Sequence, residues 1–263
     1  MDFTVLGPVG LVKGGMVRTV SGPRQRTLLA LLSIHAGEVV TKVQLFEELW
    51  ADRVPGDADN ALQALVTRFR RTLRDCLGED FMRASLLTRP AGYALNVDPA
   101  SVDVHAFDLL TAQARVKMST EPAAARDLLD RALGLWRGPA LHAVAGGPIC
   151  HSAAEQFEEA RLRAVEDRIR ATIAIGGHAA VIGELKMLVW RYPWREPFFE
   201  LLMVCQYRAG RQAEAILTYN QVRRRLVDEF GMEPSHELKR CLSAILKQDP
   251  ALGRPAAGAV IAV

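Results

Sequence analysis

The chain has 263 residues, of which 49% are hydrophobic and 24% are charged, and its formal net charge is +3. This composition is typical of a globular protein, so it excludes a disordered chain, a collagen-like sequence and a coiled-coil rod. The length favours two small domains over one large domain. No run of about 18 uncharged apolar residues occurs, and the first residues lack the basic segment of a signal peptide. We therefore expect neither a membrane-spanning helix nor a leader.

The four cysteines are far apart and form no C-x-x-C unit, which argues against a zinc ribbon and a thioredoxin motif. Isolated thiols suit the reducing cytoplasm, where they serve as small apolar core residues. The histidines also lack the spacing of metal ligands. We therefore expect no metal site, no cofactor and a cytoplasmic protein.

The chain begins with three short predicted strands, at residues 3–6, 9–12 and 16–20, with a Gly-Gly turn before the third. Pro23 then begins a helix that runs to about His35, because proline is tolerated in the first helical turn. A brief extended piece follows at 39–40. Thr41 and Gln44 form a capping box, in which each side chain can bond to the other's backbone N–H group, and the helix that they open stops near Trp50.

A loop, a long helix and a hairpin come next. The loop covers residues 51–59 and is marked by Pro55-Gly56. The helix runs from about residue 59 to 77 and is closed by Gly78. Strands at 85–89 and 93–97 are joined by a turn at residues 90–92. Three helices followed by a two-stranded wing are the order of a winged helix-turn-helix, which we expect over residues 1–97.

After Pro99 the periodicity is helical, in segments at 104–118, 122–137, 152–175, 179–191, 196–208, 212–230 and 235–247. Ser152 and Glu155 form a second capping box, at the start of one segment. Three tryptophans fall at helix ends and are expected to anchor the core: Trp136, Trp190 and Trp194. The tail at 249–263 is rich in alanine, glycine and proline and is expected to be disordered.

The helical part carries a degenerate repeat, since residues 176–182 resemble residues 210–216 at an offset of 34. That period is typical of tetratricopeptide-like helix pairs. We therefore predict a mainly α fold with a small β component, in which the winged helix is followed by an all-α tetratricopeptide-like domain at 102–248. Because only residues 98–101 separate the two domains, we expect the helical domain to dock on the winged helix.

The helix at 60–74 has one apolar arc and one polar arc. Arginine can bond guanine bidentately, asparagine and glutamine can bond adenine, and arginine and threonine also bind phosphate. At about 22 Å, the helix is long enough to lie along a major groove. An ordinary solvated basic face is the alternative, but the hairpin that follows favours DNA binding. The candidate residues on the helix and the wing are Asn60, Gln63, Thr67, Arg68, Arg70, Arg71, Arg74, Thr88 and Arg89.

The rest of the sequence gives little evidence for any other binding or catalytic site. Residues 1–97 hold 12 basic and 10 acidic residues and the rest hold 21 and 20, so the basic character is local. No phosphate-binding loop, no G-x-S-x-G and no H-E-x-x-H occurs, so we expect no catalytic residues and no enzyme. The Arg223–Arg225 cluster is expected to be a solvated face.

The chain resembles the Streptomyces antibiotic regulatory proteins over residues 1–248. The motifs that carry the likeness to an OmpR-type winged helix are Leu6-Gly-Pro-Val, Gly22-Pro-Arg-Gln-Arg-Thr, Glu48-Leu-Trp50, Asn60-Ala-Leu-Gln63, Thr67-Arg-Phe-Arg-Arg71 and Thr88-Arg-Pro-Ala-Gly-Tyr93. Those that resemble the bacterial transcriptional activation domain are Trp136-Arg-Gly-Pro-Ala-Leu141, Arg208-Ala-Gly-Arg-Gln-Ala and Glu229-Phe-Gly-Met-Glu-Pro.

The resemblance implies a pathway-specific activator of an antibiotic gene cluster. Such proteins bind direct repeats near the promoter −35 region, usually as a homodimer, and recruit RNA polymerase holoenzyme with its σ factor. The third helix would enter the major groove and Arg89 the minor groove. Three further residues match positions near the DNA backbone: Arg24, Arg26 and Trp50. Such a protein works in the cytoplasm, at the nucleoid.

In OmpR-like proteins the loop before the third helix contacts polymerase, and the resemblance assigns that role here to Asp52, Arg53 and Asp57. The acidic charge of the loop at 51–59 suits a basic σ surface better than phosphates. The alternative is a solvated connector whose acidic residues cap the third helix. For the whole chain, the alternative to a DNA-binding activator is an adaptor that holds a protein partner on its helical repeats.

Overall fold

The computed structural model describes residues 2–50 and 55–253. The chain forms two compact units. Residues up to Thr111 together with Arg131–Leu162 make the first, and Ala112–Asp130 together with the residues from Arg163 onward make the second. Among the described residues, no helix is both long and apolar enough to cross a membrane.

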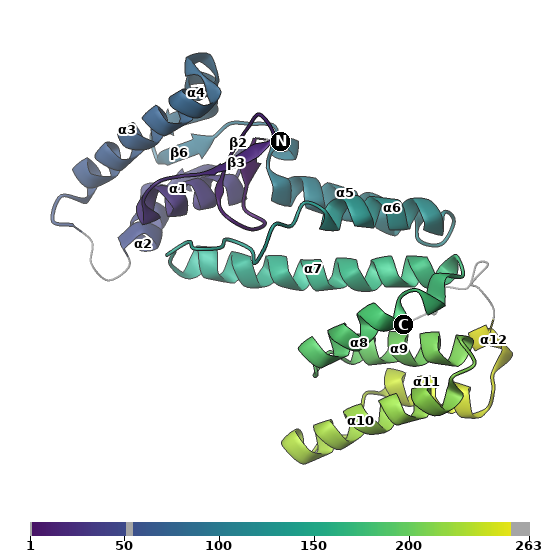
Figure 1. Cartoon of the computed structure of the whole chain (residues 1–263). Coiled ribbons are helices and arrows are strands. Elements are labelled where there is room, and N and C mark those ends of the chain that lie inside the picture. The colour runs from purple at the N-terminus through teal and green to yellow at the C-terminus, as the bar shows by residue number, and fades with distance from the viewer. Residues whose placement is uncertain (1, 51–54, 254–263) are drawn as a thin grey trace. The chain divides into compact units, whose positions relative to one another are not determined.

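The first unit holds two three-stranded antiparallel sheets (Figure 1). One has the order β1-β2-β3, built from Phe3–Thr4, Gly10–Lys13 and Met16–Thr19. The other has the order β4-β6-β5, built from Val39–Thr41, Gly92–Leu95 and Leu86–Arg89. A side chain at Gly92 would lie 1.9 Å from the carbonyl oxygen of Val40, so only glycine lets β6 approach β4 here.

The helices of this part are α1 (Pro23–Ile34), which precedes β4, and α2 (Lys42–Trp50), α3 (Ala58–Leu77) and the short α4 (Glu79–Ser85), which lie between β4 and β5 in the chain. The predicted capping box of α2 is confirmed, because Thr41 N–H donates to Gln44 Oε1 at 2.9 Å and Gln44 N–H donates to Thr41 Oγ1 at 3.3 Å. The predicted winged helix is therefore present, with α4 as an unexpected turn of helix before the wing.

A buried carboxylate joins the N-terminal strands to the start of the helical region. Asp103, the first residue of α5 (Asp103–Lys117), accepts hydrogen bonds from the backbone N–H groups of Val5 at 2.8 Å and Leu6 at 3.2 Å. The Arg137 guanidinium lies 3.1 Å from the same carboxylate. Burial raises the pKa of Asp103. The expected docking on the winged helix is confirmed for residues 102–111 and 131–162, which share its unit.

The start of α7 differs from the prediction. α7 covers Pro148–Ala174, so the capping box expected at Ser152 and Glu155 is wrong. Ser152 lies inside the helix, where Gln156 Nε2 donates to its hydroxyl at 3.3 Å. The N-terminal turn is capped instead by a side chain from α2, Glu48, which accepts from the backbone N–H groups of Gly147, Ile149 and Cys150.

The second unit is helical. Its main helices after α7 are α8 (Ile182–Arg191), α9 (Glu196–Arg208), α10 (Gln212–Phe230) and α11 (His236–Leu246). α9 packs against α8, α10 and α11, and eight of its residues are buried. The repeat at an offset of 34 has a structural counterpart, since Gly176 and Gly210 both adopt a left-handed φ, of 86° and 75°, before α8 and α10. The remaining elements are the 3-10 turns Pro99–Ser101 and Gly177–Ala179, α6 (Pro122–Leu133) and α12 (Pro250–Gly253).

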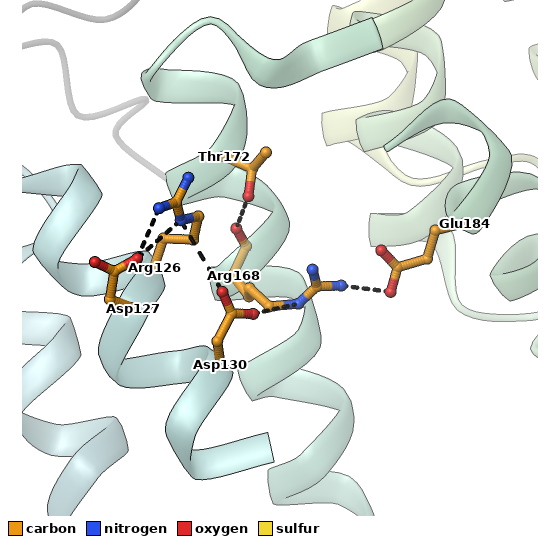
Figure 2. Close-up of polar contacts among 6 residues, drawn as sticks. All are labelled: Arg126, Asp127, Asp130, Arg168, Thr172 and Glu184. Atoms are coloured by element: carbon orange, nitrogen blue, oxygen red, sulfur yellow. Dashed lines mark hydrogen bonds and ion pairs between the residues drawn. The ribbon is translucent and has the colours of Figure 1, made fainter. Parts of the chain in front are cut away.

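A polar network ties helices of the second unit together (Figure 2). The guanidinium of Arg168 on α7 lies 3.8 Å from the Asp130 carboxylate of α6 and also pairs with Glu184 of α8. Arg126 pairs with Asp127 and approaches Asp130. The Arg168 side chain is only 18% exposed, and the two carboxylates balance its positive charge.

The expected core role of the tryptophans is wrong for two of the three, whereas the expected burial of the cysteines is confirmed for three of the four. Trp190 is 76% exposed and Trp194 43% exposed, so neither anchors the core. Trp194 instead packs edge-on against Phe230, with ring centroids 4.8 Å apart. Trp136 is half-buried against Phe107. The cysteines are free thiols, and three of them are buried as expected: Cys150, Cys205 and Cys241. The tail expected to be disordered forms α12 at 250–253, and residues 254–263 lie outside the described residues.

Candidate nucleic-acid interface

The long helix α3 has the two faces that its sequence predicts. Its buried stripe consists of Leu62, Leu65, Val66, Phe69 and Leu73. The opposite face is exposed along most of its length and carries Asn60, Gln63, Thr67, Arg68, Arg71 and Arg74. With 20 residues the helix is about 30 Å long, which exceeds the length needed to follow a major groove.

The arginines of this face differ in how much of their charge is available. Arg74 lies 3.7 Å from carboxylate oxygens of both Asp75 and Glu79, so its charge is partly compensated. Arg68 donates to the carbonyl oxygen of Ala64, one turn earlier, at 3.3 Å. Neither Arg68 nor Arg71 pairs with a carboxylate among the described residues, so the uncompensated charge is centred on the middle of the exposed face.

One arginine connects the helix to the wing. Arg70 is half-buried, and its Nη2 donates to Thr88 Oγ1 on β5 at 2.8 Å. Thr88 and Arg89 are both exposed at the end of β5, where the hairpin turns. This hydrogen bond thus links the candidate residues of the helix to those of the wing.

The first turn of α3 is held by acidic side chains. Asp57 caps the helix by accepting from the backbone N–H of Asn60 at 3.1 Å, and it also accepts from the Asn60 amide. Asp59 lies inside the helix, not in the loop, and forms an ion pair with Lys42 that raises the pKa of this lysine. Sequence reasoning missed Lys42, because the pair joins residues 17 apart with no periodic signal.

The capping of α3 by Asp57 agrees with the alternative in which the loop is a solvated connector whose acidic residues cap the helix. The polymerase-contact role of Asp57 stays a prediction, and Asp52 and Arg53 lie outside the described residues.

The candidates on α1 and α2 make mainly internal contacts. Arg26 is half-buried and donates to the carbonyl oxygens of Val20 at 3.4 Å and Ala143 at 3.3 Å. Trp50 is buried, and the exposed Arg24 lies over its ring, 5.8 Å from the centroid. Of these three, Arg24 is the side chain with an exposed cation to offer a phosphate.

Two families match the chain. Residues 18–95 match the family described as "Transcriptional regulatory protein, C terminal", and residues 102–246 match "Bacterial transcriptional activator domain". The chain belongs to the Streptomyces antibiotic regulatory protein family. It is a transcriptional regulator of that type, since its matched domains and relatives are regulators and not enzymes.

Two named regulators and one solved structure are similar to the chain. The chain is 40% identical over 257 residues to the transcriptional regulator RedD of Streptomyces coelicolor, covering 98% of this chain and 73% of that protein. It is 33% identical to the regulatory protein DnrI of Streptomyces peucetius, covering 99% of each. The solved structure of Mycobacterium tuberculosis EmbR, in complex with a low-affinity phosphopeptide, matches with a TM-score of 0.89 at 28% identity, over 96% of this chain and 68% of that chain.

Proposed function

We propose that this regulator binds duplex DNA by placing α3 in the major groove and Arg89 of the wing in the minor groove. The observation that carries the proposal is the exposed face of α3, where Arg68 and Arg71 pair with no carboxylate of residues 2–50 and 55–253. This helix is joined to the wing through Arg70 and Thr88. A narrow minor groove attracts arginine because its negative potential is enhanced. The matching regulatory domain supports the same reading.

The contacts made within the protein suggest how the roles divide. Gln63 and Arg68 are exposed and have side-chain groups suited to base edges. Thr67 and Arg71 flank them and suit phosphates. Arg70 mainly holds the wing, the Asn60 amide donates to Asp57, and Arg74 is close to two carboxylates. These three side chains therefore contribute less to DNA binding. On α1 and α2, Arg24 reaches the backbone, whereas Arg26 and Trp50 support the fold.

We further propose that the chain activates a secondary-metabolite gene cluster. It binds direct repeats near the −35 region as a homodimer and recruits RNA polymerase holoenzyme through its σ factor, with Asp52, Arg53 and Asp57 at the contact. Membership of the antibiotic regulatory family supports this reading. The activity belongs to the cytoplasm, at the nucleoid.

Base recognition is tested with Arg68→Ala and Gln63→Ala, and Arg240→Ala serves as the control because Arg240 is exposed and lies in the second unit. Binding is measured on the promoter repeat and on random duplex at two salt concentrations. Each test variant should lose about 1–3 kcal/mol of discrimination, and the control should lose none. Equal weakening on both duplexes would make these residues phosphate contacts, and an affinity for duplex that does not fall with salt would favour the adaptor alternative.

The polymerase contact is tested by replacing Asp52, Arg53 and Asp57 together with alanine. Because Asp57 also caps α3, Asp57→Ala alone is the control. Promoter binding by the triple variant alone should stay close to that of this control, while transcription by reconstituted holoenzyme falls much further. Unchanged transcription, or loss of DNA binding in step with it, would remove the loop from the proposal.

A further inference from the structure

A segment from the activator domain lies across the winged helix. This strap, residues 138–147, follows Arg137 and leads into α7. Its backbone N–H groups at Leu141 and His142 donate to the carbonyls of Val5 and Gly7, at 2.8 and 3.0 Å. Further along, its carbonyls at 143 and 145 accept from the side chains of Arg26 and Thr27 on α1. The strap is therefore held by the N-terminal strands and by α1 in turn.

The strap ends at a buried carboxylate from α2. Glu48 is 2% exposed, and it accepts hydrogen bonds from the backbone N–H groups of Gly147 at 2.9 Å, Ile149 at 2.5 Å and Cys150 at 3.2 Å. These are the free donors of the first turn of α7, and a carboxylate there also meets the positive end of the helix dipole. Figure 1 shows α2 beside the beginning of α7.

The surrounding backbone is shaped for this contact. A side chain at Gly147 would lie 3.0 Å from Glu48 Oε1, and one at Gly146 would lie 2.5 Å from Cys150 Cβ. In the strap, Leu141 and Ala143 adopt left-handed φ values of 51° and 62°, which are uncommon for residues with a side chain. Such conformations persist where the surrounding contacts hold them, and here those contacts come from the winged helix.

We propose that Glu48 is a positioning residue, which latches α7 of the activator domain to α2 of the winged helix and is needed for activation but not for binding to a DNA repeat. Glu48 lies two residues before the end of α2, where the loop proposed to contact polymerase begins. One side chain thus joins the C-terminal turn of α2 to the start of α7. The functional part of this inference rests on the DNA-binding and activating role proposed above.

The latch itself is tested by hydrogen exchange, independently of any DNA. Glu48→Gln keeps the size of the side chain but removes its charge and one acceptor, and Glu47→Gln is the control because Glu47 is the exposed neighbour on the same helix. In the Glu48 variant the amides of residues 147, 149 and 150 should exchange about tenfold faster or more, since hydrogen bonds to charged groups are the strong ones. The buried segment 198–206 of the second unit serves as the internal reference and should not change.

The functional test compares occupancy with output. For Glu48→Gln, affinity for a single repeat should stay within about twofold of the wild type, while transcription per occupied promoter falls at least about fivefold, because the latch touches neither α3 nor the wing. Gly147→Ala should give the same pattern from the opposite side of the contact, and it replaces Glu48→Gln if that variant does not fold.

Each other outcome overturns the inference. Unchanged exchange at residues 147–150 removes the latch. Faster exchange in residues 198–206 as well means that Glu48 supports general stability only. Faster local exchange with unchanged transcription per occupied promoter removes the positioning role. If the wild type itself binds no DNA, the proposed function fails, whereas the exchange result still decides whether the latch exists.

Discussion

Replacing Asp103 with alanine should destabilise the first unit by about 3 kcal/mol. The carboxylate is fully buried and accepts from two backbone N–H groups, at Val5 and Leu6, which are themselves fully buried. Each donor left without a partner costs about 1–3 kcal/mol. The Arg137 side chain is 34% exposed, so water can replace its lost partner. Relief of the buried charge offsets part of the loss, which places the net value in the middle of the range.

The assay is urea unfolding followed by tryptophan fluorescence. Replacing Trp190 and Trp194 with phenylalanine leaves Trp50 and Trp136 as reporters, and both lie in the first unit. Asp75→Ala is the control, because its carboxylate is 65% exposed and a surface change of this kind stays within about 0.5 kcal/mol. A loss for Asp103→Ala no larger than that of the control would refute the reasoning that this carboxylate holds the N-terminal strands.

Three further predictions concern pH, the wing and the second unit. Because burial raises the pKa of Asp103 above its ordinary 3.8, the folded state holds this proton more tightly than the unfolded state. The measured quantity is the unfolding free energy of the wild type minus that of Asp103→Asn. This difference should fall as the pH rises from below 3.8 through the raised pKa, and it should stay level above that pKa. A difference that rises with pH across this window would contradict the burial argument. Gly92→Ala should abolish the thermal transition of the wing, since its side chain would lie 1.9 Å from a carbonyl oxygen of β4; circular dichroism shows this, and a melting temperature within a few degrees of the wild type would refute it. Arg168→Met should cost the second unit about 0.2–1 kcal/mol, because Asp130 and Glu184 are 54% and 41% exposed and water can replace their lost partner. If the unfolding free energy of the wild type does not depend on salt, the charge argument fails.

The winged helix could be predicted from the sequence because its signals are local. The apolar stripe of α3, Gly78 after its end and the capping box of α2 each lie within one or two helical turns, and the structure has all three. The paired glycines of the helical repeat are also a local signal, since a left-handed φ favours glycine at a single position. Local periodicity and turn chemistry were therefore enough for the elements and their order.

The contacts between distant residues could not be predicted in this way. In the sequence, nothing distinguishes Glu48 from the other charged residues of its helix. The fold shows that its hydrogen-bond partners lie about 100 residues later in the chain. The same gap explains the wrong capping box, because Ser152 has the right local pattern while the real cap of α7 comes from another helix. The exposure of Trp190 was missed because periodicity does not say which apolar residues find a neighbour.

The first unit draws on two separated stretches of chain, and this has a consequence for synthesis on the ribosome. Val5 and Gly7 receive their bonds from Leu141 and His142, so the N-terminal strands cannot complete their hydrogen bonding until those residues have emerged. At about 5–20 residues per second, the wait is roughly 7–27 s. During that time the carbonyl groups of Val5 and Gly7 lack their native partners. A nascent chain stalled near residue 100 should therefore bind chaperones, whereas one stalled beyond residue 170 should not.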